Sequence, residues 1–181
     1  MAGRRARERL LSAAVELFAE HGVSGTSLQM IADRLGVTKA AVYHQFRAKE
    51  EIVLAVIEPP LLRLAPIAEA AGKRRSPAAR RDTALAGIID LVVEHRRIAA
   101  ALSFDPMVNQ LVRRHDAIKV LECLQDLLTG PDPSDATRVA VTMVSGGLMI
   151  AGTDPRLAAL DDAALRDHLL ATARRALRSR S

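Results

Sequence analysis

The 181-residue sequence is poor in aromatic side chains and in cysteine. It has no tryptophan, one tyrosine and three phenylalanines, so its core must be built from Leu, Val, Ile, Ala and Met. Cys123 is the single cysteine, which excludes a disulfide framework and a cysteine-based zinc cluster. The five histidines show no pair at metal-ligand spacing, and no group of residues marks a nucleophile with its base. We therefore expect no metal, no cofactor and no catalytic residue.

Long apolar runs are also missing. No run reaches the roughly 18 residues that a membrane span needs, and the start of the sequence lacks the apolar segment of a signal peptide. We therefore expect a soluble, cytoplasmic protein without a membrane partner.

The residues that are abundant favour helix. Hydrophobic residues make up 49% of the sequence, and Ala, Leu and Arg are frequent, which predicts an all-α fold of about nine helices. The net charge is +5, and residues 1–50 hold eight basic against five acidic side chains. Most of the excess charge therefore lies in the first third of the chain. A basic surface suits a phosphate backbone, although a charge run is more often a solvated helix face.

Apolar spacing predicts three short helices at the start of the chain. A first helix over residues 5–21 would end at Gly22, and a second over residues 28–35 would have Ser27 as its N-cap. A third would run from the cap Thr38 through Gln45. The turn Leu35-Gly36-Val37 joins two short amphipathic helices, which is typical of a helix-turn-helix. The second helix of that motif enters the major groove of DNA.

The rest of the chain reads as further helices. A fourth helix would begin at residues 48–50, and the consecutive prolines Pro59-Pro60 predict a break or a strong kink. Helical patterns continue over residues 61–72, 77–95, 97–102 and 116–128, and Asp105-Pro106 would cap a helix between the last two. Two long helices, residues 134–151 and 161–178, complete the chain. The first is apolar nearly all round and needs cover on two sides, so we expect these two helices to form a dimer interface that includes Val139, Met143, Gly146, Ile150, Leu165 and Leu169.

The run RLLSAAVELFAEHGVSGTSLQMIADRLGVTKAAVYHQFRAKEEIVLAV resembles the amino-terminal DNA-binding domain of the TetR family of bacterial transcriptional regulators. The resemblance implies a DNA-binding domain over residues 1–50 and a helical effector-binding and dimerisation domain over residues 51–181. It also implies a homodimeric, ligand-responsive repressor on a pseudo-palindromic double-stranded DNA operator. A regulator that activates, or that needs no ligand, fits the sequence equally well.

The start of each motif helix offers groups that suit DNA. The free N–H groups at a helix amino terminus, next to Thr26 and Ser27, attract phosphate. Thr38 and Lys39 open the recognition helix, and Lys39 can donate to guanine O6 and N7. Lys39 could be an ordinary surface lysine, but its place beside the cap of the recognition helix favours contact with the groove. The three hydroxyl groups would cap their helices even without DNA.

The remaining expected DNA contacts follow the recognition helix. Ala40 and Ala41 are small enough for close approach, and a methyl group can touch that of thymine. The resemblance implies that Tyr43, His44 and Lys49 contact backbone phosphates. The family often has His or Tyr just before the residue that matches Phe46, where this chain has Gln45. We therefore count Gln45 among the expected contacts.

The resemblance further implies a cavity for a small-molecule effector among the middle helices. Its candidate lining is mostly apolar, which suits a hydrophobic or weakly polar ligand, although each of these residues could be plain core. A rival hypothesis is a small α-helical enzyme or carrier, but the later helices lack the convergent titratable residues that it would need. The candidate effector residues are Phe104, Met107, Leu111, Leu121, Leu124 and Met143.

Overall fold

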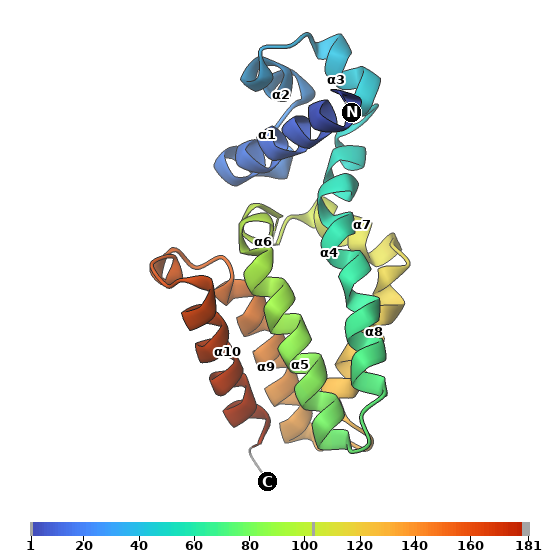
Figure 1. Cartoon of the computed structure of the whole chain (residues 1–181), viewed down its shortest axis with the longest axis vertical. Helices are drawn as coiled ribbons and strands as arrows, with labels where there is room; N and C mark the ends of the chain where they lie inside the picture. Colours follow the sequence, from blue (N-terminus) through green and yellow to red (C-terminus); the bar gives the residue numbers. More distant parts are fainter. Residues whose placement is uncertain (1, 103, 179–181) are drawn as a thin grey trace. The chain divides into compact units, whose positions relative to one another are not determined.

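The computed structural model describes residues 2–102 and 104–178, and the all-α prediction is confirmed. These residues contain no strand and form one more α-helix than expected (Figure 1). The elements are α1 (Ala2–Gly25), α2 (Leu28–Leu35), α3 (Lys39–Gln45), α4 (Lys49–Gly72), α5 (Pro77–Glu94), α6 (Arg96–Leu102), α7 (Pro106–Arg114), α8 (Ala117–Thr129), α9 (Asp135–Ala151), the 3-10 helix η1 (Pro155–Leu157) and α10 (Asp162–Leu177).

The chain divides into two compact units. Unit 1 comprises residues 1–59 and 100–114, and unit 2 comprises residues 60–99 and 115–181. The functional boundary expected after residue 50 is a different kind of division and stays a prediction.

Unit 1 is built around the apolar face of α1. Helices α1, α2 and α3 gather at one end of the unit (Figure 1). Gly22 has the left-handed φ of 72°, which ends the regular part of α1 and leaves one further turn before α2. The predicted cap before α7 is confirmed, because the Asp105 carboxylate accepts from the N–H groups of Met107 and Val108. The core of these first helices contains Leu10, Ala13, Ala14, Leu17, Phe18, Val23, Leu28, Ile31, Ala32, Val42 and Phe46.

Helix α4 runs through its two consecutive prolines without a break. The predicted helix break at Pro59-Pro60 is therefore wrong, and the alternative of a strong kink stays a prediction. Each proline removes one backbone hydrogen bond, but the turns on both sides are held by buried side chains, Val56 before the prolines and Leu64 after them. Tertiary packing thus keeps the helix continuous where local propensity disfavours it.

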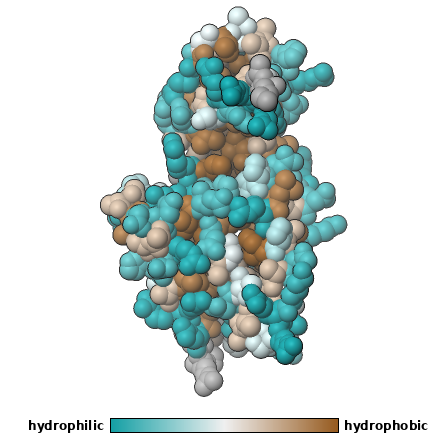
Figure 2. All heavy atoms as spheres, viewed as in Figure 1, coloured by the Kyte–Doolittle hydropathy of each residue, from teal (hydrophilic) through white to brown (hydrophobic). Residues whose placement is uncertain are grey.

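In unit 2, α5 is the central helix. It packs against α8, α9 and α10, and α9 packs against α8 and α10 (Figure 1). Leu85 and Ile89 of α5 lie in one core cluster with Leu124 of α8 and Leu165 of α10. In the view of Figure 2, mostly hydrophilic side chains cover the visible surface of this unit, with smaller apolar areas between them. Within the described residues, no helix has the length and apolar character needed to cross a membrane.

Gly87 marks a close approach of α5 to α4, and replacing it tests this packing. A Cβ atom at Gly87 would lie 2.6 Å from Cγ2 of Ile67, a β-branched side chain with little rotamer freedom in a helix. We expect Gly87→Ala to lower the free energy of unfolding by about 1–3 kcal/mol in urea denaturation, because overpacking outweighs the gain in helix propensity. Gly147→Ala on α9 is the control, since its Cβ would meet no atom within 4 Å. Equal stability of the two variants would contradict the packing described here.

Candidate nucleic-acid interface

The turn between α2 and α3 has the hydrogen bonds that the sequence predicts for a helix-turn-helix. Gly36 has the left-handed φ of 65°, and its N–H donates to the carbonyl of Asp33 at 3.1 Å. The N–H of Val37 donates to the carbonyl of Ala32 at 3.0 Å. These two bonds form a Schellman motif, which ends α2 and turns the chain sharply into α3.

Both predicted helix caps of the motif are confirmed. The Ser27 hydroxyl accepts from the N–H of Met30 at 3.2 Å, and the Thr38 hydroxyl accepts from the N–H of Ala41 at 3.2 Å. Both cap residues are exposed, so their hydroxyl groups lie at the surface at the positive ends of α2 and α3.

Helix α3 is attached to unit 1 by very few side chains. Val42 is fully buried, and Phe46, which caps the end of the helix, is 4% exposed. Arg7 of α1 lies over the Phe46 ring, with its guanidinium 5.0 Å from the ring centroid. All other side chains of α3 are exposed, and they include Lys39, Ala40, Ala41, Tyr43, His44 and Gln45.

Two of these exposed residues interact with each other. The Lys39 ammonium lies 5.6 Å from the centroid of the Tyr43 ring, one helical turn further along α3. Such a cation–π contact contributes about 0.5–1 kcal/mol at an exposed site, which is enough to bias the rotamer of a lysine. Tyr43 is itself 45% exposed, so both groups remain accessible.

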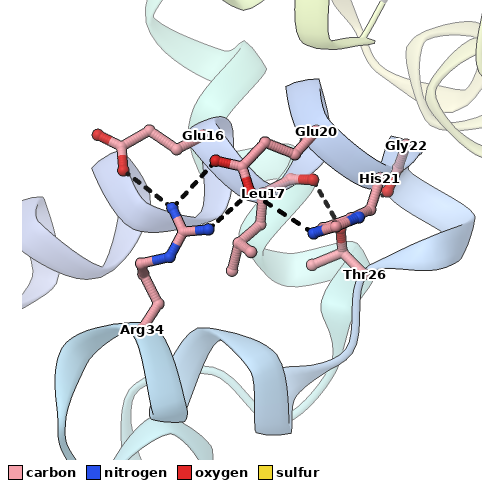
Figure 3. A network of polar contacts seen from close by, with 7 residues as sticks. All are labelled: Glu16, Leu17, Glu20, His21, Gly22, Thr26 and Arg34. Atoms are coloured by element: carbon pink, nitrogen blue, oxygen red, sulfur yellow. Dashed lines mark hydrogen bonds and ion pairs between the residues drawn. The ribbon is translucent and has the colours of Figure 1, made fainter.

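Thr26 occupies an interior position that the sequence did not predict. It is 2% exposed, and its single hydroxyl hydrogen is shared between the carbonyls of Gly22 at 2.8 Å and Leu17 at 3.1 Å (Figure 3). Gly22 lies where the regular part of α1 ends, and carbonyl groups at a helix end lack partners inside the helix. Thr26 therefore closes the end of α1, and its side chain does not lie at the surface where a phosphate would bind.

Lys49, which was expected to contact phosphate, instead donates hydrogen bonds within unit 1. Its ammonium donates to the carbonyls of Val23 at 2.6 Å, Thr26 at 2.9 Å and Ser24 at 3.2 Å. An ammonium has three donor hydrogens, so all of them are taken by the last turn of α1 and by Thr26, which follows it. Lys49 thus ties the start of α4 to that turn.

An ion-pair network that sequence reasoning missed joins α1 to α2. The Arg34 guanidinium donates to the Glu20 carboxylate at 2.6 and 3.2 Å and to Glu16 at 3.4 Å (Figure 3). The bond from Arg34 holds the pKa of Glu20 below its ordinary value. Glu16 and Glu20 are one turn apart on α1, which is visible in the sequence, but their partner on α2 is not.

The candidate effector residues are divided between the two units. Phe104 is 68% exposed and Met143 is 72% exposed, whereas Leu124 is 2% exposed in the core cluster of unit 2. Leu121 packs against the same cluster, and Met107 and Leu111 of α7 are half-buried. Their joint role in a cavity stays a prediction.

The predicted dimer residues fall into two groups. Val139, Met143, Gly146 and Ile150 lie exposed on one side of α9. Leu165 corrects the prediction, because it is 2% exposed in the core of its own unit and has no surface to offer a partner. Leu169 is half-buried and packs against the same core.

Replacing Lys49 tests its structural role. We expect Lys49→Met to lower the free energy of unfolding by about 2 kcal/mol, because three carbonyls lose a charged donor while the apolar stem is kept. Urea denaturation followed by circular dichroism measures this loss. Lys39→Met is the matched control, since Lys39 is exposed and its ammonium donates to no carbonyl of the described residues. A loss of stability in Lys39→Met as large as in Lys49→Met would refute the assignment.

Comparisons with known proteins agree with this geometry. The domain model described as "Bacterial regulatory proteins, tetR family" matches residues 10–56. The HTH-type transcriptional regulator SrpR of Pseudomonas putida is 45% identical over 51 residues. That match covers 28% of this chain and 24% of SrpR, so the two proteins correspond in sequence only over the helix-turn-helix region.

Solved structures extend the similarity to nearly the whole chain. NalD of Pseudomonas aeruginosa, described as the secondary repressor of the MexAB-OprM multidrug efflux pump, is 26% identical with a TM-score of 0.65. The similarity covers 96% of this chain and 97% of that chain. The transcriptional regulator FadR of Bacillus subtilis, crystallised with stearoyl-CoA, shares the fold with a TM-score of 0.63 at 20% identity, over 92% of this chain and 96% of that chain. Residues 10–56 of the chain thus form a DNA-binding domain like that of the TetR family of bacterial regulatory proteins, and the whole chain shares its fold with members of that family.

Proposed function

We propose that this chain is a transcriptional regulator that binds a pseudo-palindromic DNA operator as a homodimer. The observation that carries the proposal is the exposure of α3. Apart from Val42, every side chain of this helix is exposed, on a helix that follows a Schellman turn. A helix of this kind fits the major groove, which admits one α-helix.

The exposed side chains suit distinct contacts. Lys39 reads a base edge, with Ala40 and Ala41 allowing close approach. The accessible side chains of Tyr43, His44 and Gln45, with the caps Ser27 and Thr38, contact the phosphate backbone and set the register. Thr26 and Lys49 are left out of the contact set, because their donors are used within unit 1.

The homodimer is supported by the outer side of α9. Val139, Met143 and Ile150 are 58%, 72% and 52% exposed, and they follow one face of the helix. A Cβ atom at Gly146 would meet nothing within 4 Å, so the backbone there is open to close approach. Burying each large side chain would contribute about 1.5–3 kcal/mol. A two-fold axis presents the same face of a second copy, and two such copies would place their α3 helices in major grooves about 34–36 Å apart.

We further propose that the regulator is a repressor released by a small hydrophobic effector. The similarity in fold to FadR, which was crystallised with stearoyl-CoA, and to the repressor NalD supports this. Release requires that the effector bind more tightly to a conformation whose α3 helices no longer match the groove spacing. Expression of a reporter gene placed behind an operator that the chain binds should then rise when the gene for this chain is deleted. A fall in that reporter would indicate an activator.

Selection of bound sequences from random duplex DNA tests the proposed function directly. The full chain should enrich a pseudo-palindrome whose half-sites lie about 10 base pairs apart, or slightly more, because each copy contributes one α3 helix. Repeating the selection in the presence of long-chain acyl-CoA and other lipophilic compounds tests release. Enrichment of no sequence, at a salt concentration where DNA is still bound, would refute sequence-specific regulation.

Lys39→Ala distinguishes base reading from phosphate contact. If Lys39 donates to a base, the variant loses about 1–3 kcal/mol of discrimination between the selected operator and an operator changed at one base pair. Competition binding at fixed salt measures this difference. Lys119→Ala, which removes an exposed lysine from α8, is the control for net charge. Uniform weakening on every DNA sequence would instead assign Lys39 to the backbone.

Met143→Arg and Gly146→Leu test the dimer. Each variant should convert the dimer to a monomer at micromolar concentration in light scattering, because a charge or a bulky side chain is placed in a tightly packed apolar face. Leu62→Arg on α4 is the matched control, since Leu62 is another apolar side chain with high exposure, at 64%. An unchanged dimer in the two α9 variants would show that the interface lies elsewhere.

A further inference from the structure

A hollow in unit 2 has a basic lining that nothing in the proposed function uses. It has a volume of about 370 Å³, near the lower end of the roughly 300–1,000 Å³ range of small-molecule sites. Three arginines and one aspartate give the lining a formal charge of +2. The lining residues are Ala78, Arg81, Asp82 and Leu85 of α5 with Arg174, Leu177 and Arg178 at the end of α10.

The single carboxylate neutralises only one of the three guanidinium groups. Arg174 binds Asp82 in a bidentate manner, with Nε–Oδ1 at 2.6 Å and Nη2–Oδ2 at 2.7 Å. The hydrogen bond from Arg174, with the attraction of Arg174 and Arg178, lowers the pKa of Asp82 below its ordinary value. Asp82 is therefore ionised at neutral pH and fully engaged by Arg174.

Arg81 holds its charge without a carboxylate among the described residues. Its Nε is buried and has no hydrogen-bond partner among the described protein atoms. Its two terminal nitrogens reach only the carbonyls of Leu177 at 3.4 Å and Thr129 at 3.5 Å, at the long limit of a hydrogen bond. These contacts hold the guanidinium in place and leave one further N–H on each terminal nitrogen for an anion.

Arg178 and the start of α5 add to the positive potential. The Nε of Arg178 donates to the carbonyl of Arg174 at 3.2 Å, and no described carboxylate pairs with it. Ala78 lies in the first turn of the 18-residue helix α5, which has no acidic residue there. The partial positive charge of that helix end therefore adds to the charge of the arginines. The carboxyl end of α10 carries a partial negative charge, but its carbonyls already accept hydrogen bonds from Arg81 and Arg178.

We propose that this hollow binds a small molecule that carries a phosphate monoester. The dianion would lie between Arg81 and Arg178, and its charge would offset the formal charge of the lining. Guanidinium groups match phosphate oxygens in planar, charge-assisted hydrogen bonds. Leu85 and Leu177 form an apolar wall for the organic part of the ligand. None of the six predicted effector residues lines this hollow, and the proposal does not depend on DNA binding.

Calorimetric titration of the full chain with phenyl phosphate tests the site, at pH 7.5 and constant ionic strength. Inorganic phosphate shows how much the anion alone contributes, and phenol is the uncharged counterpart. We expect one saturable site per chain for phenyl phosphate, weaker binding of inorganic phosphate and no binding of phenol. Arg81→Gln and Arg178→Gln should each weaken phenyl phosphate at least about tenfold, because each removes a charged donor.

Arg80→Gln is the control for net charge. Arg80 is exposed on the same turn of α5 and does not line the hollow, so its removal should leave the affinity within about twofold. Thermal unfolding shows whether each variant is folded, and Arg178 is exposed, so its variant keeps the test valid if Arg81→Gln is unstable. The proposal is overturned if the wild-type chain shows no saturable binding at millimolar concentration. Equal affinity of the wild type and a folded Arg81→Gln or Arg178→Gln, or equal weakening by Arg80→Gln, overturns it as well.

Discussion

The last carbonyl groups of α1 need hydrogen-bond donors, and the geometry of the DNA-binding motif depends on how they find them. The Thr26 hydroxyl is shared between the carbonyls of Leu17 and Gly22. The Lys49 ammonium donates to three further carbonyls, those of Val23, Ser24 and Thr26. One donor comes from the turn before α2 and the other from the start of α4. Both donors bind carbonyls near the end of α1. This places Thr26, and with it the start of α2, and it places Lys49, which follows the end of α3. The recognition helix is therefore positioned from both of its flanks.

This constraint matters because α3 has little stability of its own. A seven-residue helix in water is far below the length at which isolated helices form, so its structure comes from tertiary contacts. Those contacts are the buried side chains of Val42 and Phe46. Arg34 of the neighbouring helix is held to α1 by Glu16 and Glu20, which adds a polar connection on the exposed side. A helix with so few attachments can offer nearly its whole surface to a ligand.

Local sequence patterns correctly predicted the features of the fold that depend only on residues close together in the chain. The caps Ser27 and Thr38, the turn at Gly36 and most helix bounds follow from spacing and from the conformational preferences of single residues. The roles of Thr26 and Lys49 could not be predicted, because the partners of Lys49 lie 23 to 26 positions away. The continuity of α4 through Pro59-Pro60 and the burial of Leu165 also depend on which helices pack together. An apolar position on a helix indicates that the side chain is buried. It does not indicate whether the residues that bury it belong to the same chain or to a partner.

The seam between α5 and α10 connects the two proposals for unit 2. Arg166 pairs with Asp90 and Arg174 pairs with Asp82, so the acidic side chains of α5 that face α10 are used to hold that helix. Helix α9 packs against α5, α8 and α10 and leaves Val139, Met143 and Ile150 exposed, and this is the apolar face that we propose for a second copy. The same pairing leaves Arg81 and Arg178, at the end of the seam, without a carboxylate partner among residues 2–102 and 104–178. Because Asp82 is the single carboxylate in the lining of the hollow and is paired with Arg174, the ion pairs that hold α10 to α5 also leave the hollow with a positive charge.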